Sequence, residues 1–157
     1  TFITMVWPLW AIGFANVLNN FGATFSFYYS GKFLRRFKET HILLFKTIWG
    51  KLTGLIAFGI PTFISPFIMA TGSLLYGISQ VAENKLRQAE FTDHQRATMS
   101  SLNSFGGSIG FALMSVILGS LADAMDPARA LLTLNIISLP VIYLYWLLFR
   151  NDRKIKA

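Results

Sequence analysis

Residues 97–122 read ATMSSLNSFGGSIGFALMSVILGSLA and contain no charged side chain. About 20 apolar residues suffice to cross a bilayer as a helix, so this run is long enough to do so. Gly106 and Gly110 lie four residues apart, and Gly107 lies between them. Small residues at this spacing let two helix backbones approach closely where lipid offers no hydrophobic drive. We therefore predict a transmembrane helix that packs through these three glycines.

The composition is typical of a membrane protein. The chain has 157 residues, of which 54% are hydrophobic and 13% are charged, whereas soluble domains carry about 25% charged residues. The charged residues gather between long apolar runs. The net charge of +7 therefore indicates contact with lipid headgroups rather than with nucleic acid, because the basic residues flank apolar spans.

Five apolar segments predict an all-α, polytopic transmembrane helix bundle that forms a single membrane domain over residues 1–157. Pro61 and Pro66 interrupt what would otherwise be one overlong run, because proline breaks a helix interior. The chain starts at Thr1 without an initiator methionine or a basic signal-peptide region, so we expect it to be a fragment of a larger protein. The predicted spans are residues 9–30, 42–60, 63–82, 97–122 and 130–149.

The distribution of charge predicts the orientation of the bundle. Lys and Arg occur in residues 31–38, in residues 83–96 and in the tail after Phe149, whereas the turn at 60–66 is uncharged and residues 123–129 are net acidic. Loops rich in Lys and Arg stay on the cytoplasmic side of a membrane. We therefore expect a multi-pass plasma-membrane protein with a cytoplasmic C-terminus and an N-terminus outside.

Several polar side chains fall inside the predicted spans. Asn16, Asn20 and Thr24 follow one another at intervals of four residues and so share a helix face. Such a face is costly in lipid, and it predicts either a substrate cavity or interhelical hydrogen bonds. Lys46 is close enough to the membrane surface to extend to it. Lys51 falls near the middle of its span, where an ionisable group is a functional hypothesis by default, unless a late-starting or tilted helix brings it to the headgroups.

The sequence predicts no enzyme, no metal site and no cofactor. It has no cysteine, its two histidines His41 and His94 sit at loop edges, and no carboxylates cluster at ligand spacing. It also lacks the Gly-x-x-x-x-Gly-Lys-Ser/Thr loop that holds nucleotide phosphates. The polar residues of the spans are therefore candidates for lining a substrate cavity: Asn16, Asn20, Thr24, Lys51, Gln80 and Asn103.

Two segments resemble the C-terminal half of a major facilitator superfamily transporter, most closely the bacterial drug and small-molecule efflux members. Residues 31–36, GKFLRR, are similar to a degenerate copy of the Gly-x-x-x-Asp-Arg-x-Gly-Arg loop between helices eight and nine of that family. Arg35 stands where the pattern has an acidic residue, and Lys38 stands at its second glycine.

The second segment begins at Arg96 and ends at Asp123. Its RATMSS start, its Asn, Ser and paired Gly residues, and its GSLAD close are similar to the entry and exit of helix eleven in the same family. The resemblance covers nearly the whole chain from about Pro8 and implies helices eight to twelve. The candidates for a cytoplasmic loop or gate are residues of the first segment, of the start of the second and of the loop just before it: Gly31, Lys32, Arg35, Arg36, Asp93 and Arg96.

The resemblance implies secondary active transport of a small molecule by alternating access, usually coupled to protons. The expected partners are the lipid bilayer, the N-terminal half of the same transporter and the small-molecule substrate, in a bacterial inner membrane. Because no predicted span contains Asp or Glu, a proton-carrying carboxylate would come from the other half. An integral membrane scaffold or assembly subunit that does not transport is the alternative.

Overall fold

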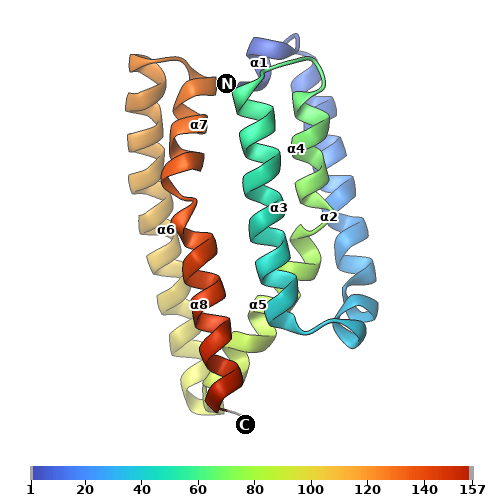
Figure 1. Cartoon of the computed structure of the whole chain (residues 1–157), viewed down its shortest axis with the longest axis vertical. Helices are drawn as coiled ribbons and strands as arrows, with labels where there is room; N and C mark the ends of the chain where they lie inside the picture. The colour runs from blue at the N-terminus through green and yellow to red at the C-terminus, as the bar shows by residue number, and fades with distance from the viewer. Residues whose placement is uncertain (1, 156–157) are drawn as a thin grey trace.

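The computed structural model describes residues 2–155 and the side chains of all of these except 93, 148 and 151–155. All regular secondary structure in the described chain is helical and no described residue forms a strand, so the predicted all-α fold class is confirmed (Figure 1). Its helices are α1 (Phe2–Val6), α2 (Ala11–Arg36), α3 (Glu39–Gly59), α4 (Ser65–Ser73), α5 (Tyr76–Glu90), α6 (Asp93–Ala124), α7 (Pro127–Ile137) and α8 (Pro140–Ile155).

Three stretches are long and apolar enough to cross a membrane, as expected of a membrane protein: Glu39–Gly59, His94–Ala124 and Pro127–Leu147. The α2 helix spans 26 residues, but its polar Asn and Ser residues lower its hydropathy. The α4 and α5 helices are each too short to span alone. None of the most apolar part of α6 is buried inside the described chain.

Two polar segments that we predicted as loops are largely helical. The α2 helix continues through residues 31–36, because Lys, Leu and Arg are good helix formers and Arg35 and Arg36 complement the negative end of the helix dipole. The polar segment 83–96 is likewise divided between α5 and α6, and only residues 91–92 connect them. The prediction that these two segments are loops is therefore wrong, because each helix extends further into its polar flank than the apolar run indicates.

The basic segments gather at one end of the bundle. The α2–α3 connection, the α5–α6 connection and the end of α8 lie at the lower end of Figure 1, and α1, the α3–α4 connection and the α6–α7 connection lie at the upper end.

At the upper end, the Asp126 carboxylate accepts hydrogen bonds from the backbone N–H groups of Ala128 and Arg129, 2.9 and 3.0 Å away. This cap starts α7.

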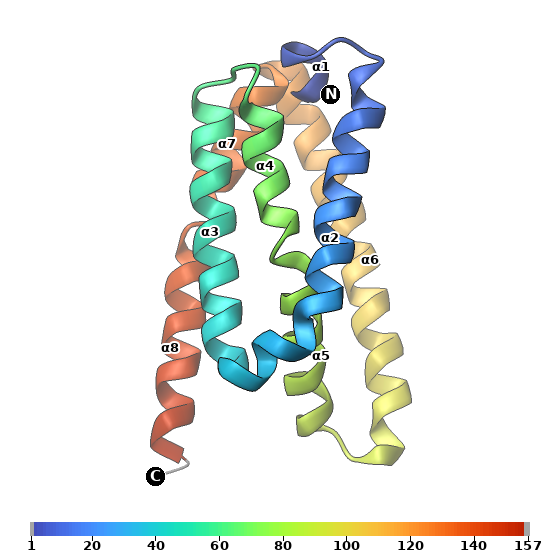
Figure 2. The same ribbon diagram turned by 90° about the vertical axis from the view of Figure 1, so that its right-hand side faces the viewer.

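The third predicted pass is divided at Leu74 and Leu75. Their N–H groups bond to carbonyls three residues earlier, on Thr71 and Gly72, so the helix tightens and then restarts as α5 (Figure 2). A restarted helix exposes N–H groups that lipid cannot satisfy. One of them, on Ile78, donates to the hydroxyl of Ser26 on α2 across 3.0 Å.

Ser26 therefore stabilises the break from a neighbouring helix, and it is only 1% exposed. Replacing Ser26 with alanine should cost about 1–3 kcal/mol, because the Ile78 N–H would be left buried without a partner. Ser115→Ala is the matched control, since the Ser115 hydroxyl bonds only within the exposed α6, to the Phe111 carbonyl. Unfolding in detergent measures both variants, and equal stability of the two would contradict this role.

The last predicted pass is divided at Ser138 and Leu139. Pro140 has no N–H and restricts the residue before it, which ends α7. The Leu139 N–H instead donates to the Ile136 carbonyl, three residues earlier, at 3.0 Å. Figure 1 shows this break near the middle of the long axis of the bundle.

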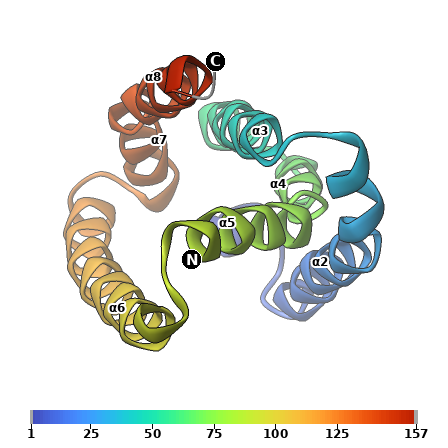
Figure 3. The same cartoon turned by 90° about the horizontal axis from the view of Figure 1, so that it is seen from below.

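Close packing is concentrated among α2, α3, α4 and α5. A buried cluster of Ile42 and Leu43 on α3 and Ile78 and Ala82 on α5 forms one core. The α6 helix contacts mainly α7 and lies on the side away from α2 and α4 (Figure 3). One long helix is therefore only loosely attached to the rest.

Candidate functional site

Lys51 of α3 meets the break between α7 and α8. Its Nζ donates a hydrogen bond to the Ser138 hydroxyl oxygen, 2.5 Å away. The Ser138 hydroxyl in turn lies 2.7 Å from the Leu134 carbonyl and 2.9 Å from the Asn135 carbonyl, where it donates its own hydrogen. Proline removes the regular backbone donor at this point, so the break provides the polar surroundings that an amine requires inside an apolar span.

Asn135 lies beside this contact, one turn before the break. Its side chain is 9% exposed, and its Nδ2 approaches the Lys51 carbonyl at 3.4 Å. A Cβ on Gly54 would lie 1.9 Å from that Nδ2, so only glycine leaves room for the amide. We call Lys51, Gly54, Asn135 and Ser138 the Lys51 cluster.

The Lys51 cluster contains unused hydrogen-bonding capacity. The Oδ1 of Asn135 is buried and has no partner among the described residues, which costs about 1–3 kcal/mol. No described carboxylate forms an ion pair with Lys51. A donating amine and an accepting amide oxygen thus lie on neighbouring residues at one helix break. The amine can bind an acceptor or anionic group of a small molecule, and the amide oxygen can bind a donor group.

The structure places the predicted α2 stripe away from this cluster. Asn16, Asn20 and Thr24 are exposed on a face of α2 different from the one that buries Ala15 and Ser26. The Thr24 hydroxyl donates back to the Asn20 carbonyl, 2.9 Å away. Within the part of the chain that the structure describes, the stripe therefore makes no interhelical hydrogen bond.

The remaining cavity candidates are also separate. Gln80 is half-buried on α5, and Asn103 is exposed on α6. Neither forms a hydrogen bond with Lys51 among the described contacts. The six candidates therefore lie on four helices, and the structure joins only the neighbours on α2.

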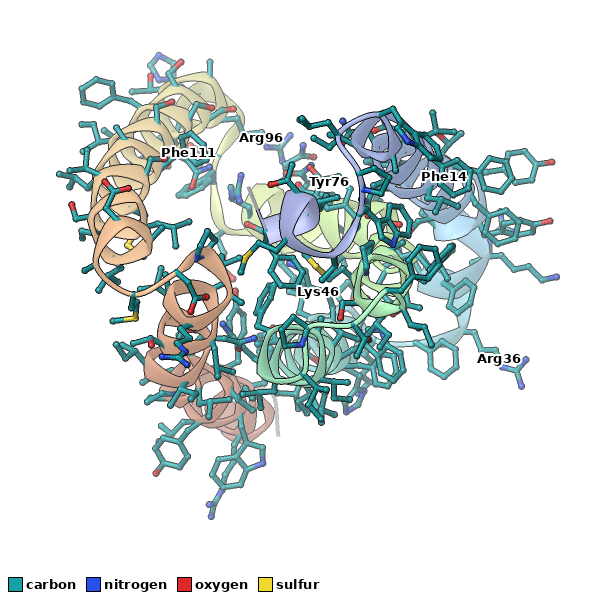
Figure 4. The ribbon with its side chains drawn as sticks, turned by 90° about the horizontal axis from the view of Figure 1, so that it is seen from above. Phe14, Arg36, Lys46, Tyr76, Arg96 and Phe111 are labelled. Carbon is teal, nitrogen blue, oxygen red and sulfur yellow. The ribbon has the colours of Figure 1, made fainter. Side chains whose placement is uncertain are left out.

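The candidate gate residues lie at the basic end. Gly31, Lys32, Arg35 and Arg36 are all exposed at the end of α2, and Arg36 extends away from the other helices (Figure 4). Arg96 is exposed in the first turns of α6, on the side facing α5 (Figure 4). The side chain of Asp93 lies outside those described.

The predicted packing glycines differ from those at which the helices cross. A Cβ on Gly106, Gly107 or Gly110 would meet nothing within 4 Å, so no other described helix covers this face of α6, and its packing role stays a prediction. The observed close approaches are at Gly22, where a Cβ would lie 2.1 Å from the Ser73 hydroxyl, at Gly54 of the Lys51 cluster, and at Gly77.

Sequence reasoning missed Ser26, Asn135 and Ser138. Asn135 is the only amide in residues 130–149, and Ser138 precedes Pro140 by two positions. These features signal a polar break in the last span. They do not reveal that Lys51 faces it, because that depends on how α3 and α7 rotate against each other.

Comparisons of the chain with known protein families, with curated proteins and with solved structures found no match.

Proposed function

We propose that this chain is the C-terminal portion of a secondary active transporter that moves a small molecule across a membrane by alternating access. The observation that carries this proposal is the Lys51 cluster at a helix break near the middle of the bundle. Secondary transporters commonly bind substrate near the bilayer midplane, where interrupted helices present polar groups. The break between α4 and α5 supplies a second interruption.

In the proposed topology the chain crosses the membrane five times. The crossings are α2, α3, the α4–α5 pair, α6 and the α7–α8 pair. Their connections alternate between the two ends of the bundle. With the Lys- and Arg-bearing end in the cytoplasm, the C-terminus is cytoplasmic, as the positive-inside rule requires. On the sequence resemblance to the major facilitator superfamily, we propose that the protein belongs to a bacterial inner membrane and couples transport to protons.

The exposed faces of α2 and α6 are suited to packing against a second, N-terminal half of the same transporter. Asn16 and Asn20 would be costly against lipid, and α6 presents Gly106 and Gly110 with no described helix against them. Small residues and amides are the groups through which membrane helices associate. An N-terminal half seated on these faces would complete the carrier and enclose the path. A scaffold subunit would offer the same faces to a different partner, and transport assays distinguish the two.

The test is gradient-driven flux by the full reading frame that contains this chain. In inverted membrane vesicles with a proton gradient, we expect uptake of at least one member of a panel of small amphipathic substrates, and none from residues 1–157 alone. Flux by residues 1–157 alone would contradict the proposed partner half. Absence of gradient-driven flux across the panel favours the scaffold alternative.

The α2 stripe gives a site-specific prediction. Asn20→Leu should change the substrate range or lower the transport rate by about tenfold, a transition-state effect of about 1.4 kcal/mol. Val17→Leu is the control, because Val17 is exposed on the same helix and already apolar. Equal flux in both variants would assign Asn20 to packing.

A further inference from the structure

The bend between α5 and α6 forms a partly open pocket that the proposed transport path does not use. Its volume is about 290 Å³, near the lower end of the ~300–1,000 Å³ range of small-molecule sites. It lies at the basic end of the bundle, next to the α5–α6 connection. Its lining residues are Asn84, Arg87, Gln88, Phe91, Arg96, Ala97 and Ser100.

The lining is rich in hydrogen-bond donors. Five of these seven side chains can donate, two of them are guanidinium groups, and none is acidic. Arg87 and Arg96 come from different helices, so they approach the pocket from two sides. A planar guanidinium donates two parallel hydrogen bonds to the oxygens of a phosphate group, which a lysine cannot do.

Glu83 orients the side chain of Arg87, one of the two arginines that line the pocket. The Arg87 Nη2 donates to a Glu83 oxygen one turn earlier on α5. This contact holds the long Arg87 side chain at the pocket, with 30% of it exposed, and so reduces the entropy lost when a ligand binds. A guanidinium has five N–H groups, so Arg87 keeps donors for a second acceptor.

We infer that this pocket binds a phosphate group, supplied either by an anionic phospholipid headgroup or by a free phosphate compound. Anionic headgroups lie at the depth where basic residues flank membrane spans, and basic pockets between helices bind them. Bound phosphate would link α5 to α6, which otherwise packs mainly on α7. This inference is independent of the transport proposal.

The experiment measures thermal melting of the purified full chain in a neutral detergent. Dihexanoyl phosphatidylglycerol, dihexanoyl phosphatidylcholine and inorganic phosphate are titrated separately, with ionic strength matched by sodium chloride. We expect phosphatidylglycerol or inorganic phosphate to raise the melting temperature, and the stronger of the two identifies the source. Phosphatidylcholine, whose phosphate is neutralised by choline, should act more weakly.

Variants decide whether the pocket is responsible. Arg96→Gln should weaken binding about tenfold, the usual value of one charge-assisted contact. Ser100→Asp tests the same pocket without removing an arginine, and it should also weaken binding because it places a negative charge there. Arg36→Gln is the control, since it removes an equal charge from an exposed position at the same end.

Loss of the effect in Arg96→Gln and Ser100→Asp with retention in Arg36→Gln supports the pocket. An equal reduction in all three variants would show only a surface-charge effect and would overturn the inference. So would a melting temperature that none of the three probes raises.

Discussion

Replacing Gly77 with alanine should destabilise the bundle, because it adds a methyl group against the backbone of a neighbouring helix. Gly77 is where α5 crosses α2, and an added Cβ would lie 2.5 Å from the backbone nitrogen of Phe27 and 2.9 Å from its Cα. A side chain can rotate away from such a contact, but backbone atoms cannot. Overpacking a tight core costs about 1–3 kcal/mol, and we expect the upper end of that range.

Gly72→Ala is the matched control for this prediction. A Cβ on Gly72 would meet nothing within 4 Å, and alanine is favoured over glycine in a helix by about 1 kcal/mol. The two variants should therefore change the free energy of unfolding in opposite directions. Unfolding by dodecyl sulfate, followed by circular dichroism in mixed micelles, measures both. A Gly77→Ala protein as stable as Gly72→Ala would show that α2 and α5 do not cross here.

The comparison of Gly77 with Gly106 shows how far a sequence determines such a contact. Hydropathy and length predict that both glycines lie in apolar helices, and the all-α bundle follows from the same signal. Which glycine faces a neighbouring backbone depends on helix rotation and tilt, which are set by distant residues such as Phe27. The spacing of Gly106 and Gly110 is the better sequence motif, yet the described contacts are at Gly22, Gly54 and Gly77.

The break between α7 and α8 can be predicted from the sequence, whereas the break between α4 and α5 cannot. Pro140 makes the break after α7 predictable, because proline lacks an N–H wherever it stands. No proline lies at Leu74 or Leu75. There the restart of α5 is stabilised by Ser26, a residue about fifty positions earlier whose hydroxyl accepts from Ile78. The candidate site likewise depends on contacts between distant residues. The sequence predicts that Lys51 lies inside a span, but only the packing of α3 against α7 makes Asn135 and Ser138 its neighbours.

Replacing Lys51 with methionine should lower transport by the full-length carrier by at least about tenfold, while the protein stays folded. Methionine keeps the unbranched shape of the side chain and removes the amine that donates to Ser138. If the amine binds substrate or a coupling group near the midplane, the variant loses that interaction. A loss of about 1.4 kcal/mol of transition-state stabilisation already lowers the transport rate about tenfold. Lys38→Met is the control, because Lys38 is exposed at the start of α3.

Stability separates this role of Lys51 from a structural one. A charged amine near the centre of a bilayer costs about 2.5–3.5 kcal/mol, so its removal should leave the protein equally stable or more stable. Ser138 keeps its bonds to the Leu134 and Asn135 carbonyls in the variant. If Lys51 instead serves mainly to join α3 to the break, Lys51→Met should lose about 0.6–2 kcal/mol, the range for an interhelical hydrogen bond in a membrane. Measured together, normal transport with reduced stability would assign Lys51 to packing, and impaired transport with undiminished stability would assign it to the transport path.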